Sequence, residues 1–169
     1  MSVFNRTGRI VEDNWKTLTE DHDVENLEKA SYIVSIEQWN QYGHILCQQE
    51  RNLALKLTID ADLAELQNDI GFFSLIVIEF PHFTDGQGFS LAALLRERYG
   101  YRGELRAAGS ILLDQLFYLK RCGFDSFELP ETESEPSVNP SEVVRALNSF
   151  SESYQQSSDQ PLPLFRWRT

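Results

Sequence analysis

Polar side chains that could take part in catalysis or binding lie just after a strongly apolar stretch, residues 75–80. This segment contains His82, Thr84, Asp85 and Gly86. An imidazole titrates near neutral pH, so His82 beside the Asp85 carboxylate could act as an acid–base pair. Glycines ahead of a helix can also present backbone N–H groups to an anion. The segment is therefore the first candidate for catalysis or ligand binding.

Four predicted strands each contain one charged residue, and the signs alternate along the chain. These residues are Lys56, Glu79, Arg106 and Glu128. A buried carboxylate without a partner is strongly unfavourable, so we predict that Glu79 pairs with Arg106 or Lys56. Two interpretations stay open. The charges form a polar network that fixes strand order, or they serve a ligand or a reaction, because perturbed carboxylates cluster at functional sites.

The full set of candidates lies mostly where strands end and helices begin. The catalytic candidates are His82, Asp85, Arg106 and Asp114. The candidates for ligand or partner binding are Glu79, Thr84, Gly86, Arg96, Arg102, Gln115 and Glu128. No Ser or Cys stands at a recognisable nucleophile elbow, so the sequence leaves open whether the chain is an enzyme.

Cofactor signatures are missing from the sequence. Cys47 and Cys122 lie far apart and outside any metal-ligand spacing, so we predict no metal and expect two buried thiols. Neither a GxGxxG nor a GxxxxGK[ST] motif is present. The cofactor is therefore left open, and FMN is compatible because flavodoxin-like sheets hold it at their strand ends.

Size and charge narrow the class of protein. A chain of 169 residues, 41% of them hydrophobic, suits one globular domain. The formal net charge of −11 argues against nucleic acid or an anionic membrane as main partner. The sequence has neither a signal peptide nor an apolar run of membrane-spanning length, so we expect a cytoplasmic protein. A homodimer is compatible with these features.

The pattern from residue 31 onward alternates strands with helices. Strands are predicted at 32–34, 53–59, 75–80, 104–108 and 125–129. Helix starts are predicted from a Ser35/Gln38 capping box and from caps at Asp60, Ser90, Ser110 and Asn139. The Asp60 helix would bury Leu63, Leu66 and Ile70, Gly123 would end the Ser110 helix, and the last helix would reach about residue 154.

Consecutive strand–helix units predict an α/β fold with parallel strands and right-handed crossovers. Two closures compete: a three-layer, flavodoxin-like doubly wound sheet and a partial (βα) barrel. The near-solid apolar stretch 75–80 favours the first and predicts a central strand. We divide the chain into an irregular arm (1–30), one α/β domain (31–154) and a polar tail (155–169).

The order and spacing of residues 74–79, residues 123–130 and the final helix resemble a response-regulator receiver domain. Receivers carry a phosphorylated Asp, a Ser or Thr and a Lys where this chain has Glu79, Ala107 or Ala108, and Leu129. The resemblance therefore implies a scaffold for a non-catalytic binding module rather than phosphotransfer.

A longer resemblance covers residues 53–129. The stretches that carry it are EFPHFTDG (79–86), SLA (90–92), LRERYGYRGELRA (95–107), LDQLF (113–117) and RCGFD (121–125). They resemble the bacterial domain-of-unknown-function family nine hundred and thirty-four, whose members are described as oxidoreductases of sulfite reduction because they accompany assimilatory sulfite reductase. The family usually has Arg at Gln87 and often an acid at Ser110. The resemblance implies an accessory protein that docks to sulfite reductase or its electron donor, with a small-molecule enzyme at the strand ends as a further alternative.

Overall fold

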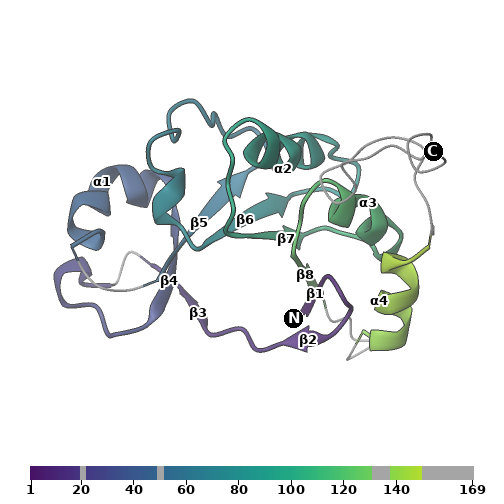
Figure 1. The fold of residues 1–169 in the computed structure, drawn as a ribbon. Coiled ribbons are helices and arrows are strands. Elements are labelled where there is room, and N and C mark those ends of the chain that lie inside the picture. The colour runs from purple at the N-terminus through teal and green to yellow at the C-terminus, as the bar shows by residue number, and fades with distance from the viewer. Residues whose placement is uncertain (20–21, 49–51, 131–137, 150–169) are drawn as a thin grey trace.

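The computed structural model describes residues 1–19, 22–48, 52–130 and 138–149. Its strands form one eight-stranded sheet in the order β2-β1-β8-β7-β6-β5-β4-β3. The sheet is curled like half a barrel (Figure 1), and the predicted α/β class is confirmed. No helix in these ranges has the length and apolar character needed to cross a membrane.

The central strands are parallel and follow one another in chain order. They are β4 (Ser31–Ser35), β5 (Leu53–Thr58), β6 (Leu75–Phe80), β7 (Glu104–Gly109) and β8 (Ser126–Leu129). Flavodoxin-like and receiver sheets reverse their winding direction once, which creates a switch point. The observed strand order has no such reversal among its parallel strands, so the doubly wound, three-layer prediction is not met. The alternative, a partial barrel, describes the sheet better.

Winding in one direction decides where the helices lie. Right-handed crossovers that always advance the same way place their helices on one face of the sheet. The helices are α1 (Ile36–Leu46), α2 (Gln87–Glu97), α3 (Leu116–Arg121) and α4 (Pro140–Leu147), with short 3₁₀ turns η1 (Val24–Asn26), η2 (Ile70–Phe72) and η3 (Leu113–Gln115). The main hydrophobic core fills the space between this helical layer and the convex face.

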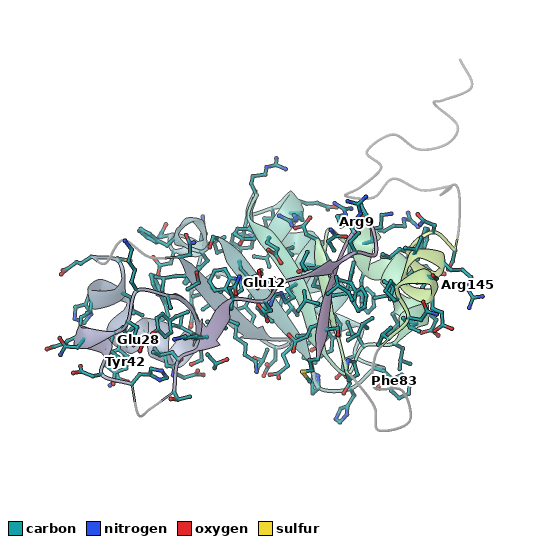
Figure 2. The ribbon with its side chains drawn as sticks, turned by 90° about the horizontal axis from the view of Figure 1, so that it is seen from below. Arg9, Glu12, Glu28, Tyr42, Phe83 and Arg145 are labelled. Carbon is teal, nitrogen blue, oxygen red and sulfur yellow. The ribbon has the colours of Figure 1, made fainter. Side chains whose placement is uncertain are left out.

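The N-terminal arm contributes strands to both edges of the sheet. β1 (Ser2–Asn5) pairs antiparallel with β8, and β2 (Ile10–Val11) pairs with β1. β3 (Trp15–Thr17) pairs parallel with β4 at the opposite edge. Residues 12–14 therefore cross the open, concave face, as the chain around Glu12 does in Figure 2.

Strand β6 is central, as its apolar sequence predicted, but its two faces are covered differently. Ile76 and Ile78 belong to the main core under the helices. Val77 belongs to a second, smaller cluster on the concave face, against which Trp15 packs. The concave face of β6 is covered by the N-terminal arm rather than by a second layer of helices. A strand that is apolar on both faces therefore wrongly suggested a three-layer fold.

Three predicted helix boundaries are confirmed. The Ser35 hydroxyl accepts a hydrogen bond from the Gln38 backbone N–H while the Gln38 side chain accepts one from the Ser35 N–H. The Asn139 side chain caps α4 through the Ser141 N–H. Gly123 has φ +106, the left-handed conformation predicted after a helix. Helix α4 ends at Leu147, with Asn148 as its C-cap, so the predicted extension to about residue 154 is wrong. The polar tail (155–169) lies outside the described residues.

Three other predicted helix starts are wrong. Residues 60–69 form turns closed by bonds such as Leu66 N–H to the Leu63 carbonyl, although Leu63, Leu66 and Ile70 are buried as predicted. Asp62 bonds the Ala64 N–H, a local contact that competes with a helix. Helix α2 starts at Gln87, which places Ser90 inside it. The Ser110 hydroxyl donates to the Pro81 carbonyl instead of capping a helix.

Candidate functional site

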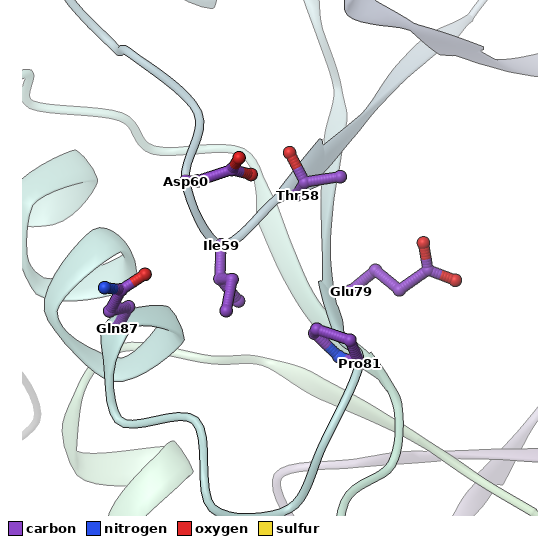
Figure 3. A pocket seen from close by; sticks show the side chains of 6 residues that line it. All are labelled: Thr58, Ile59, Asp60, Glu79, Pro81 and Gln87. Atoms are coloured by element: carbon purple, nitrogen blue, oxygen red, sulfur yellow. The ribbon is translucent and has the colours of Figure 1, made fainter.

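An open cavity of 350 Å³ lies where β5 and β6 end, the edge at which the sequence predicted a site. It is lined by Thr58, Ile59, Asp60, Glu79, Pro81 and Gln87 (Figure 3). The Thr58 hydroxyl donates a hydrogen bond to Asp60 and lowers the pKa of that carboxyl group. Ile59 and Pro81 give the cavity an apolar wall.

Glu79 pairs with Lys56, one of its two predicted partners. Lys56 Nζ lies 2.8 Å from Glu79 Oε1, and each side chain is 41% exposed. Water therefore reaches the pair, unlike the buried carboxylate that the sequence suggested. Glu79 is paired in register with Thr58 of β5 and Ala108 of β7. It also lines the cavity, so it lies between the cavity and the concave face.

The loop after β6 holds the other main candidates, but not as a catalytic pair. The Asp85 carboxylate accepts a hydrogen bond from the backbone N–H of His82, 3.0 Å away, so it shapes the loop. His82, Thr84 and Gly86 are exposed. Packing explains the glycine at position 88, because a Cβ there would lie 2.4 Å from Phe80 Cζ. Within the described loop, no contact between the Asp85 carboxylate and the His82 ring supports the predicted acid–base assignment.

Two neighbouring loops, 81–86 and 110–112, are joined by side chains at the same edge. Ser110 donates to the Pro81 carbonyl over 3.0 Å, and Gln115 Nε2 donates to the Phe83 carbonyl over 2.6 Å. Gln115 Oε1 also accepts from the Leu112 N–H at 3.0 Å. We call these two loops, with Gln115, the edge platform. Its apolar side chains Phe83 and Leu112 are 54% and 45% exposed.

Arg96 and Arg102 lie at the opposite edge, where strands begin. Arg96 donates to the carbonyl oxygens of Tyr101 and Gly103 at 2.8 Å and of Gly123 at 2.9 Å, and forms an ion pair with Asp125. Its guanidinium is thus occupied by the protein itself. Arg102 is exposed beside it. The structure therefore separates both arginines from the cavity and the platform.

Arg106 lies on the concave face, and its side chain is only 4% exposed. Its Nη1 lies 3.0 Å from Asp13 Oδ1 in the arm, and its Nη2 lies 3.5 Å from Glu104 Oε1. The Ser126 hydroxyl, 3.4 Å from Nε, completes the surroundings. Strand periodicity puts Glu128 on this face too, two residues beyond Ser126.

A second cavity, of 290 Å³, lies beside α1 and contains Cys47 and Asp69 among its lining residues. Cys47 is exposed and Cys122 is half-buried, so the expectation of two buried thiols is not met. Desolvation and the neighbouring Asp69 carboxylate raise the pKa of the Cys47 thiol, which disfavours the reactive thiolate. Within the described ranges, no three His, Cys, Asp or Glu side chains are grouped so as to hold a metal ion.

The fold and site define an α/β half-barrel protein with a polar cavity and an exposed loop platform where its central parallel strands end. Residues 54–165 match the family model DUF934, described as a bacterial protein of unknown function. The match spans more than half of the chain, so the protein belongs to this family. Searches among curated proteins and among solved structures found no match.

Sequence reasoning missed several residues of these sites. Asp60 was interpreted as a helix cap, although its position directly after a strand was a usable signal. Leu112 follows a strand in the same way. Asp13 gave no signal, because it lies in a segment without periodicity and 93 residues from Arg106.

Proposed function

We propose that the protein is a cytoplasmic accessory protein of assimilatory sulfite reduction, which docks through the edge platform onto the reductase or its electron donor. The pathway rests on the family resemblance, and the docking rests on one observation. Phe83 and Leu112 are large, exposed apolar side chains on loops that hydrogen bonds hold in place. Aromatic anchors of this kind dominate the energetics of many protein interfaces.

The preorganised loops support docking on energetic grounds. A surface that is already ordered loses less conformational entropy on binding than a flexible one. Gln115 holds both loops at once, through the Phe83 carbonyl and the Leu112 N–H. The exposed Asp114 adds negative charge beside the platform. The proposed partner surface is therefore basic around an apolar pocket.

The test measures binding of the whole chain to purified sulfite reductase and, separately, to its electron donor. We expect F83A to weaken binding at least about tenfold, as loss of a central anchor does. Phe72→Ala is the matched control, because Phe72 is 59% exposed but lines the cavity beside α1. Equal binding of F83A, F72A and the unmodified chain, or no binding to either protein, would refute the proposal.

A second candidate function is binding or conversion of a small molecule in the 350 Å³ cavity. The observation that favours it is the combination of the Asp60 carboxylate and the Lys56–Glu79 ion pair with a partly apolar wall. Such a wall suits a ligand with amine or hydroxyl groups on an apolar body. The test is a thermal-shift screen of amines and polyols against the unmodified chain and D60N. A ligand that raises the Tm of both equally would not bind at this cavity.

The strand order does not provide the kind of site at which flavodoxin-like sheets bind FMN. Flavodoxin-like sheets bind FMN at the switch point where the winding reverses, and the consecutive order of β4 to β8 has no such point. An absorbance spectrum of the purified protein is the direct test, since bound flavin absorbs at about 450 nm.

A further inference from the structure

Arg106 is a buried cation whose nearest anion comes from an exposed segment. Its guanidinium lies on the concave face between Val77 of β6 and Ser126 of β8, at the centre of the sheet. The contact with Asp13 Oδ1, at 3.0 Å, is shorter than those with Ser126 and Glu104. The Asp13 side chain is 37% exposed, whereas that of Arg106 is 4% exposed.

The segment that supplies Asp13, residues 12–14, is held at both ends by paired strands, and its own contact with the sheet is made through Asp13. We call it the strap. It joins β2 at one edge to β3 at the other, and its residues are exposed and take no part in strand pairing. Glu12, next to Asp13, is seen on the chain that crosses the sheet in Figure 2. Among the described residues, the Asp13–Arg106 ion pair is the side-chain contact that ties the strap to the concave face.

Electrostatics sets a condition on strap opening. A buried guanidinium that loses its carboxylate is strongly destabilised, because desolvation of the charge is no longer offset. Glu104 compensates poorly, since its Oε1 is 3.5 Å from Nη2 and is shared with the Ser126 hydroxyl. The strap can therefore leave Arg106 readily only if another anion takes the place of the Asp13 carboxylate.

We propose that the concave face around Arg106 is a binding site for a small carboxylate, and that Asp13 is its internal competitor. Arginine suits this role, because its planar fork matches a carboxylate in geometry and charge. The surrounding floor combines the short side chains Ala54 and Ala108 with Val77 and Leu75, and Trp15 and Ile33 pack against it. A ligand carboxylate displaces Asp13, and the strap lifts from the face. This inference does not depend on the edge platform or on any partner protein.

The first experiment uses acetate as probe and chloride at equal ionic strength as reference, with thermal unfolding as readout. D13A removes the competitor, so we expect acetate to raise its Tm in a saturable way and to bind at least about tenfold more tightly than to the unmodified chain. E12A is the matched control, because Glu12 is an exposed carboxylate on the same strap. Equal responses of D13A and E12A would overturn the proposal. If D13A does not fold in chloride, folding restored by acetate supports it, and failure of acetate to stabilise D13N overturns it.

The second experiment tests displacement in the unmodified chain. A Glu-specific protease cuts after Glu12 when the strap is released, and cleavage after the exposed Glu65 in the same sample corrects for effects of salt on the protease. We expect acetate to raise the ratio of Glu12 to Glu65 cleavage relative to chloride, towards the ratio seen in D13A. A ratio that is the same in both salts would show that Asp13 is not displaced.

Discussion

Replacing Arg96 should destabilise the protein far more than replacing Arg102, the exposed arginine beside it. The Arg96 guanidinium donates to three backbone carbonyls, from Tyr101, Gly103 and Gly123, and pairs with Asp125. These groups come from the turn before β7 and the turn before β8, so one side chain joins α2 to the amino ends of two strands. Only 13% of the Arg96 side chain is exposed.

The magnitude follows from what the truncation leaves behind. Removing one partner of a buried ion pair costs about 3–5 kcal/mol. Asp125 is 34% exposed and keeps the Leu105 N–H as a donor and Arg6 Nη1 at 3.6 Å, so water and these contacts recover part of the loss. We therefore expect R96A to lower the free energy of unfolding by about 3 kcal/mol. R96K should lower it by about 2 kcal/mol, because an ammonium keeps the charge but cannot reach three carbonyls at once.

The assay is urea unfolding of the whole chain at neutral pH, with the m value checked for each variant. Arg102→Ala is the control, since Arg102 is exposed close by and should change stability by less than about 0.5 kcal/mol. A loss below about 1 kcal/mol for R96A, or equal losses for R96A and R102A, would refute the stabilising role assigned to these contacts.

Three further outcomes are expected. Burial raises the pKa of Tyr101, so above about pH 10, the ordinary phenol pKa, the unfolded chain loses a proton that the folded chain retains. The free energy of unfolding should therefore fall with rising pH, and Y101F should lack this slope in urea titrations from about pH 9 to 11. A slope in Y101F equal to that of the unmodified chain would contradict the cause given. Gly123→Ala should cost at least about 2 kcal/mol in the same assay, because φ is +106 and the Cβ would lie 2.6 Å from Arg96 Cγ, whereas Gly71→Ala, with nothing within 4 Å, should cost little. A double-mutant cycle on Lys56 and Glu79 should give a coupling of no more than about 1 kcal/mol, and a much larger value would mean that the pair is shielded from water.

Local patterns in the sequence determined much of the fold. Alternating apolar residues at Leu53, Leu55 and Leu57 identified β5, and the apolar run of β6 identified a central strand. The capping box at Ser35 and the cap at Asn139 set two helix starts, because both rest on contacts between residues only two or three apart. The Lys56–Glu79 pair was predictable as one of two alternatives, because Lys56 and Arg106 both lie diagonally from Glu79 on the strands next to β6.

The tertiary structure decided the strand order and the partners of the buried charges. Nothing local distinguishes a strand covered by a second helical layer from one covered by Trp15 of the arm, so the apolar run of β6 wrongly favoured the doubly wound order. Asp13 meets Arg106 only because β2 and β3 take opposite edges of one sheet. Tertiary structure likewise decides the role of Arg96. Its charge suggested a ligand-binding residue, but it donates hydrogen bonds to the backbone carbonyls of Gly103 and Gly123. Contacts between residues distant in the chain depend on how the elements pack, and the spacing of residues along one segment does not contain that information.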